Sequence, residues 1–131
     1  DGVHALTDVT GFGLAGHGLE IARGAGATLR IDWARVPIFP EVRELAAQGH
    51  ITGASGRNWA GYGVEIRLPM GFGDVELGLL TDPQTSGGLL VSCAPDAVDT
   101  VLEIFRRNGF ADAAEIGEVM PRDPAAALVV A

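Results

Sequence analysis

The sequence contains no lysine, and all nine of its basic residues are arginines. A Walker-type phosphate loop and Schiff-base catalysis both need a lysine, so this chain offers neither. Cysteine is almost as scarce: Cys93 is the single one, which excludes a disulfide or a cysteine-based zinc site within the chain. One unpaired thiol favours a reducing compartment, and we expect a cytoplasmic location.

Positive charge and long apolar runs are also missing. Seventeen acidic residues against nine arginines give a formal net charge of -8. This balance argues against nucleic acid as a partner, because phosphate backbones need a basic face. No apolar run approaches the roughly 20 residues of a membrane span, and no signal peptide opens the chain, so we expect no membrane association.

Apolar residues and glycine are abundant instead. Hydrophobic residues make up 47% of the 131 positions, and the 19 glycines are about twice the usual share. The length fits one domain spanning residues 1–131. Because the sequence begins at Asp1 without a methionine, we expect either a processed product or an excised piece of a longer protein, and the motifs below favour the second.

Hydrophobic spacing and turn residues predict an alternation of strands and helices. Residues 51–63 are rich in glycine and are expected to form a loop with a helical turn, and residues 75–81 suit a strand or a short helix. The order predicts an α+β domain, in which helices cover a mixed β-sheet. The expected strands are 3–6, 27–32, 64–68, 89–93, 114–119 and 126–130, and the expected helices begin near Thr10, at Pro40 and at Pro95 and end near Gly24, Gln48 and Gly109.

A dinucleotide-binding pattern is present in residues 11–16 (GFGLAG), which match G-x-G-x-x-G, with Asp32 at the end of a following strand. Two features argue against it. Polar residues at 7–10 interrupt the expected strand, and Asp8 would place negative charge beside a pyrophosphate. The alternative is that small residues let a helix pack closely against its neighbours. These are Gly11, Gly13, Gly16 and Gly18.

A carboxylate precedes that glycine-rich helix start, in residues 7–14 (TDVTGFGL). On composition alone, Asp8 or Thr10 is best explained as a helix cap. The alternative is that Asp8 binds Mg²⁺, which is commonly held by one or two carboxylates together with phosphate oxygens and water. An acidic protein that handles a polyphosphate would need such a cation.

A third motif occupies residues 80–91 (LTDPQTSGGLLV). The hydroxyls of Thr85 and Ser86, and the amides around Gly87 and Gly88, could cradle an anion. Taken alone, the segment is more typical of a structural loop, since Asp-Pro turns the chain and Gly-Gly permits a bend.

The remaining candidates favour structural roles. His17 and Glu20, three residues apart, are expected to contribute to helix packing rather than to a metal site. Cys93 ends an apolar strand and is expected to be an inert core thiol. Arg57, Asn58 and Trp59 are expected on the ordinary surface, with contact to a ligand or partner chain as the alternative.

Two of these segments together resemble selenophosphate synthetase, also called selenide, water dikinase. They are residues 4–20 (HALTDVTGFGLAGHGLE) and 80–90 (LTDPQTSGGLL), in that family's order and approximate spacing. Arg57 and Asn58 are similar to a stretch that lies between them in the family. The resemblance covers essentially the whole chain but only the C-terminal half of the family, which is related to aminoimidazole ribonucleotide synthetase.

The resemblance implies a two-domain enzyme that converts ATP, selenide and water to selenophosphate, AMP and orthophosphate. ATP would bind mainly to the N-terminal domain, through which the family forms homodimers. Asp8 matches an aspartate that helps to bind Mg²⁺ at the ATP phosphates. Thr7, Thr10 and the segment Thr85–Gly88 would form a wall facing the phosphates.

The family's catalytic cysteine or selenocysteine, its nearby lysine and its glycine-rich N-terminal segment are absent from this chain. We therefore expect no catalytic residue here, and an isolated domain that is folded but inactive. Three alternatives stay open: another ATP-dependent enzyme of the same superfamily, a non-catalytic binding or assembly domain, and a dinucleotide-binding module.

Overall fold

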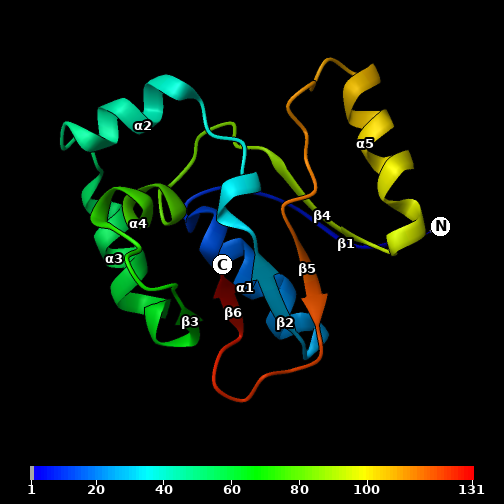
Figure 1. The fold of residues 1–131 in the computed structure, drawn as a ribbon, viewed down its shortest axis with the longest axis horizontal. Coiled ribbons are helices and arrows are strands. Elements are labelled where there is room, and N and C mark those ends of the chain that lie inside the picture. Colours follow the sequence, from blue (N-terminus) through cyan, green and yellow to red (C-terminus); the bar gives the residue numbers. More distant parts are fainter. Residues whose placement is uncertain (1) are drawn as a thin grey trace.

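The computed structural model describes residues 2–131, which form an α+β domain with two sheets (Figure 1). In the four-stranded sheet, of order β3-β6-β2-β5, β2 is parallel to β6 and antiparallel to β5, and β3 is parallel to β6. The mixed sheet with helices confirms the predicted fold class. The strands of this sheet are β2 (Thr28–Ile31), β3 (Ile66–Arg67), β5 (Gly117–Met120) and β6 (Leu128–Val130).

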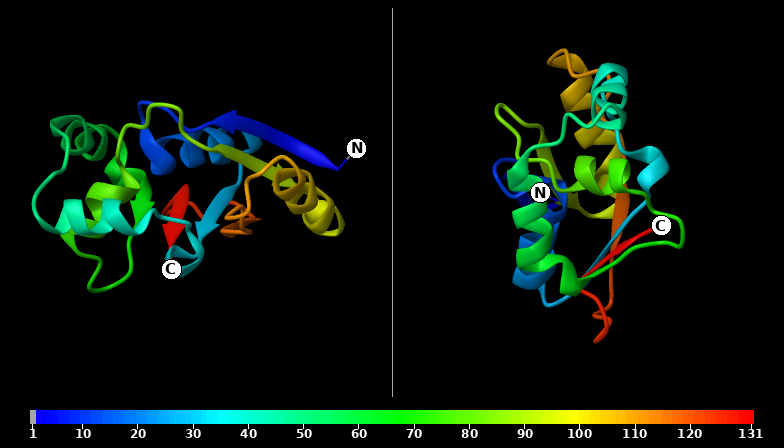
Figure 2. Two further views of the ribbon diagram at one scale, coloured as in Figure 1. Left: turned by 90° about the horizontal axis from the view of Figure 1, so that it is seen from above. Right: turned by 90° about the vertical axis from the view of Figure 1, so that its left-hand side faces the viewer.

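The second sheet is a two-stranded antiparallel ribbon of β1 (Val3–Asp8) and β4 (Leu89–Cys93). We call it the β1–β4 ribbon. In Figure 2 it runs along one side of the molecule, over α1 and toward α5. Its strands come from opposite ends of a long sequence interval, so it brings the two sequence motifs into one place.

Five α-helices surround the sheets, with α2, α3 and α4 on one side and α5 on the other (Figure 1). Three short 3-10 turns complete the structure. The helices are α1 (Gly13–Ala25), α2 (Pro40–Ala47), α3 (Gly53–Tyr62), α4 (Asp74–Leu80) and α5 (Val98–Arg107), and the turns are η1 (Trp33–Arg35), η2 (Gly63–Glu65) and η3 (Pro95–Ala97). None of these helices is long and apolar enough to cross a membrane in the part of the chain that the structure describes.

The core lies where α1 packs against β2 and β6. Leu19, Ile31 and Leu128 are almost completely buried there. Gly18 permits the close approach of the helix, since a Cβ at this position would lie 2.9 Å from Leu29 Cδ2 and 3.0 Å from Leu128 Cδ1. Small residues on α1 therefore serve packing, as the alternative to the dinucleotide pattern predicts.

Two local expectations are wrong, and one open alternative is decided. The glycine-rich segment 51–63 is mostly helix α3, and its Thr52 side chain caps the helix by accepting from Ser55 N. For residues 75–81 the helical alternative is confirmed, since residues 75–80 lie in helix α4 and Thr81 is its C-cap. Neither Asp8 nor Thr10 caps α1, whose N-cap is Phe12 and has no side-chain cap.

Candidate functional site

Residues 8–13 and 81–89 lie side by side, and we call this contact region the motif junction. Asp8 is the register partner of Leu89 in the β1–β4 ribbon. Beyond the ribbon, Val9 N donates to Gly88 O at 2.9 Å, and Gln84 N donates to Thr10 O at 3.0 Å. Backbone hydrogen bonds thus continue past the ends of the strands and hold the two loops together.

Two glycines allow the backbones to meet at the motif junction. Gly13 has φ +70, and a Cβ there would lie 2.7 Å from the carbonyl carbon of Thr81. A Cβ on Gly87 would lie only 2.0 Å from Val9 O. Since neither contact leaves room for a side chain, the two motifs fit one another only with glycine at these positions.

Helix α3 also stabilises the motif junction, through hydrogen bonds from its side chains to both motifs. The Asn58 amide donates from Nδ2 to Gly11 O at 2.9 Å and to Thr81 O at 3.0 Å, so one side chain bridges both motifs. The Tyr62 hydroxyl donates to Phe12 O at 2.6 Å, and burial raises the pKa of Tyr62 to about 12. Asn58 was expected on the surface, but it is half-buried and cross-links the site.

Sequence reasoning missed the role of α3 because its inward face is polar. Ser55, Asn58 and Tyr62 recur at intervals of three and four residues, which is the spacing of one helix face. Ser55 Oγ donates to Gly78 O at 3.1 Å and also contacts Thr81 Oγ1. The Thr52 cap and this polar period were the signals in the sequence that could have revealed the helix.

Asp8 lies exposed at the end of β1. No hydrogen bond or ion pair joins its carboxylate to another group among residues 2–131, whereas the neighbouring Thr7 hydroxyl donates to Asp8 O at 3.1 Å. The strand pairing fixes the backbone of Asp8, and its carboxylate stays available to a ligand. The same described range contains no cluster of three or more His, Cys, Asp or Glu side chains suited to a metal ion.

Thr10 is engaged within the chain. Its hydroxyl lies 3.1 Å from His17 Nε2, and His17 Nδ1 lies 2.9 Å from a Glu20 carboxylate oxygen. His17 is 7% exposed, whereas Glu20 is exposed. The expected packing role thus fits His17, whereas Glu20 contacts His17 from the surface. The contact with His17 orients Thr10 in the loop before α1.

The segment Thr85–Gly88 forms the exposed rim of the motif junction. Thr85, Ser86 and Gly88 are exposed, and Gly87 is half-buried against Val9. Ser86 adopts the left-handed conformation, with φ 55, which a non-glycine residue rarely does. Thr85 and Ser86, which come shortly after Asp82 and Pro83, therefore present their hydroxyls to solvent.

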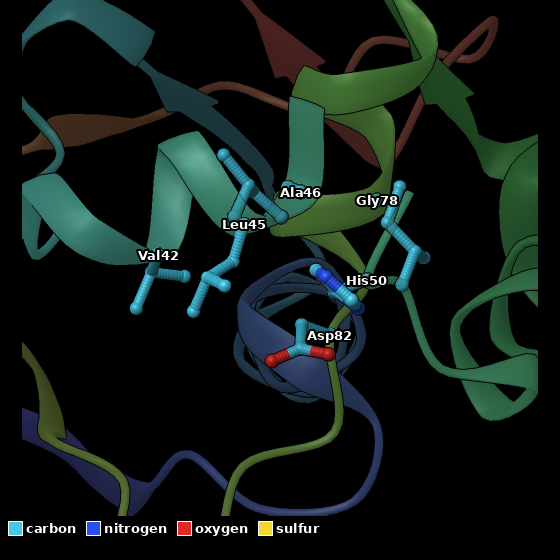
Figure 3. A pocket seen from close by; sticks show the side chains of 8 residues that line it. Val42, Leu45, Ala46, His50, Gly78 and Asp82 are labelled. Atoms are coloured by element: carbon cyan, nitrogen blue, oxygen red, sulfur yellow. The ribbon is translucent and has the colours of Figure 1, made fainter. Parts of the chain in front are cut away.

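A small cavity of about 110 Å³ lies beneath this loop, between α2, α4 and residues 50–51. Asp82 and His50 both border it (Figure 3). Burial raises the pKa of the Asp82 carboxyl. The remaining lining is mainly apolar: Val42, Leu45, Ala46, Ile51, Gly78 and Leu79.

Two other sequence candidates lie apart from the motif junction. Cys93 pairs with Val3 at the far end of the ribbon from Asp8, and it is half-buried rather than part of the core. The dinucleotide interpretation requires consecutive strands of one parallel sheet, yet β1 and β2 belong to different sheets. The glycines after β1 are instead used for close packing.

Comparison with known proteins places the whole chain in one family. Residues 1–129 match the family described as AIR synthase related protein, C-terminal domain. The chain is 62% identical over 119 residues to a selenide, water dikinase of Pseudomonas straminea, covering 91% of the chain and 33% of the relative. A selenide, water dikinase of Burkholderia pseudomallei is also 62% identical, covering 91% and 34%, and that of Dechloromonas aromatica is 52% identical, covering 95% and 36%. The chain thus spans about a third of the length of these relatives.

Proposed function

Because the chain belongs to the family of AIR synthase related proteins, as their C-terminal domain, we propose that it is the C-terminal domain of a selenide, water dikinase. The full-length enzyme would form selenophosphate, AMP and orthophosphate from ATP, selenide and water. The observation that carries the proposal is the motif junction, because it joins the two segments on which the family resemblance depends.

The role of Asp8 follows from its position. Strand pairing fixes the position of the backbone that carries the Asp8 carboxylate. Because this exposed carboxylate has no partner among the described residues, it can bind a cation without breaking another contact. We infer that Asp8 supplies one oxygen ligand to Mg²⁺ at the phosphates of ATP. A single carboxylate suits a shared magnesium site, since Mg²⁺ usually takes one or two protein carboxylates and completes its shell with phosphate oxygens and water.

When bound, Mg²⁺ would neutralise phosphate charge. The contribution of this chain is to orient the polyphosphate beside Asp8. The exposed hydroxyls of Thr85 and Ser86 are suited to donate to phosphate oxygens, and Thr10 shapes the opposite wall. Thr7 is the register partner of Leu90 and lies on the inward face of the ribbon, so it would support the backbone of Asp8 rather than face the phosphates. Gly87 and Gly88 keep that rim free of side chains. Positioning of this kind is the main requirement of phosphoryl transfer.

The proposal extends to the rest of the protein. The N-terminal part would supply most of the ATP site and the catalytic residues, and it would form the homodimer. The isolated domain would be inactive, because it offers only one wall of the phosphate site. We further propose a cytoplasmic location.

The decisive experiment uses the parent protein, meaning this chain together with the residues that precede it in its gene. Phosphorus NMR would follow Mg-ATP with and without selenide, under anaerobic reducing conditions, with the isolated chain as control. We expect selenide-dependent AMP, orthophosphate and a selenium-coupled phosphorus signal. ADP as the product would indicate another enzyme of the superfamily, and a folded parent protein without turnover would favour a non-catalytic domain.

A further inference from the structure

An apolar strip covers the outward face of the β1–β4 ribbon. Val3, Leu6 and Leu89 are large apolar residues that remain 50%, 60% and 52% exposed. Strand register places them on one face: Leu6 is opposite Val91, Leu89 is opposite Asp8, and Val3 is opposite Cys93. The other face points inward, where Leu90 packs against the core. The solvent-facing side of an antiparallel sheet usually carries polar residues, so this exposed apolar face indicates that a covering element is missing.

The strip continues onto helix α5. A shallow hollow between the start of β1 and this helix is lined by Val3, Val101 and Ile104, with smaller and polar residues around them. Helix α5 has apolar and charged sides, yet it has no buried residue and contacts little besides η3. Ile104 is 48% exposed. An amphipathic helix whose apolar side stays half-open indicates a neighbour that is missing from the structure.

The length of the relatives identifies that neighbour. About two thirds of each selenide, water dikinase lies outside the match, and the family description assigns the matched part to the C-terminal domain. The relatives therefore carry an N-terminal part that precedes the segment matching this chain. The strip also ends at Asp8, so a domain that covers it would reach the carboxylate proposed to bind the metal.

We propose that the N-terminal part of the full-length protein docks on this strip, defined by Val3, Leu6, Leu89, Val91 and Ile104, through an apolar surface of its own. The proposal rests on the proposed function for the existence of that part. Docking on the ribbon would hold Asp8 in register with ligands from the other domain, because the strip and the carboxylate share one face of the same strand pair.

Cysteine labelling of the parent protein tests the covering directly. Leu6→Cys would be compared with Phe39→Cys, whose site at the start of α2 is 72% exposed. Maleimide modification of each site would be followed by peptide mass spectrometry, which also separates Cys93. We expect Cys at position 6 to react at least about tenfold more slowly than Cys at position 39, at every protein concentration, since burial protects a site from reagent.

Equal rates at the two sites would overturn the proposal. Slow modification at position 6 that becomes fast on dilution would overturn it as well, because a second copy would then be the cover. The labelling requires no turnover. A parent protein that makes no selenophosphate but protects position 6 would refute the proposed function and leave the docking intact.

A pair of charged variants links docking to the site. Leu6→Glu in the parent protein should raise the KM for Mg-ATP by about tenfold, because a charge buried in an interface displaces the two domains. Phe39→Glu should leave the KM unchanged. An unchanged KM in a soluble, folded Leu6→Glu protein would contradict the docking; if Leu6→Glu fails to fold, the labelling experiment decides.

Discussion

The two sides of this domain are held together in different ways. Between α1 and the four-stranded sheet, fully buried aliphatic side chains such as Leu19 and Leu128 fill the space. At the motif junction, the contacts are backbone hydrogen bonds, the Asn58 amide and glycines that leave no room for a Cβ. Side-chain packing can adjust to small changes, whereas backbone against backbone cannot. The candidate site therefore lies in the part of the molecule where small displacements are tolerated least.

The largest expected effect separates ligand binding from stability. Asp8→Asn in the parent protein should lower turnover by about a hundredfold or more, because the proposed Mg²⁺ ligand would be lost. The exposed carboxylate has no internal partner among the described residues, so the thermal unfolding temperature should not change. Steady-state kinetics and calorimetry measure the two. The exposed Asp112→Asn is the control, and near-normal turnover of Asp8→Asn would refute the role.

Three glycine substitutions test whether the motif junction tolerates an added side chain less well than the aliphatic core does. Gly87→Ala meets a backbone oxygen at 2.0 Å and should lower the free energy of unfolding by about 2 kcal/mol or more. Gly18→Ala meets the tips of two leucine side chains, which can shift, and should cost less. Gly88→Ala meets no atom within 4 Å and serves as control. Urea unfolding gives all three values, and equal losses for Gly87→Ala and Gly18→Ala would remove the distinction.

The Asn58 bridge permits a smaller test. Asn58→Ala leaves Gly11 O and Thr81 O without their donor, so the free energy of unfolding should fall by about 1–2 kcal/mol. Asn108→Ala removes one exposed hydrogen bond to its own helix and should cost less than about 0.5 kcal/mol. If the two losses are equal in denaturant titrations, the bridge contributes no special stability.

The smallest effect concerns pH. Burial raises the pKa of Asp82 in the folded state, so the folded protein binds this proton more tightly than the unfolded chain does. As pH rises from the ordinary aspartate pKa through the raised value, this group reduces the free energy of unfolding. The Asp82→Asn protein lacks this pH-dependent destabilisation. Its free energy of unfolding should therefore rise, relative to that of the unmodified protein, from acidic to neutral pH. Urea titrations at several pH values measure the difference; a constant difference would contradict the prediction.

Much of this domain was predictable because its signals are local. Alternating residues predicted β2, the proline at position 40 predicted the start of α2, and the apolar spacing after Pro95 predicted α5. Helix α3 was not predictable in the same way. Its glycines lower helix propensity, and its stability comes from Ser55, Asn58 and Tyr62, whose partners are far away in the sequence.

The candidate site was likewise predictable only in part. The family resemblance selected Asp8 and the segment Thr85–Gly88, and their ligand roles stay predictions. Neither motif alone predicts that the two segments are in contact, because strand pairing between distant segments has no local signal. The Asn58 bridge was missed because an amide in a glycine-rich stretch resembles ordinary surface.

The pairing of β1 with β4 has a consequence for how the protein matures. These strands enclose the segments that form α1, β2, α2, α3 and α4, and Asn58 reaches the motif junction from the middle of that interval. Because closing so long a loop is entropically costly and slow, we expect the junction to complete late in folding. A chain in which α3 has not yet docked would lack the Asn58 bridge, and it would not yet hold Asp8 beside the Thr85–Gly88 rim.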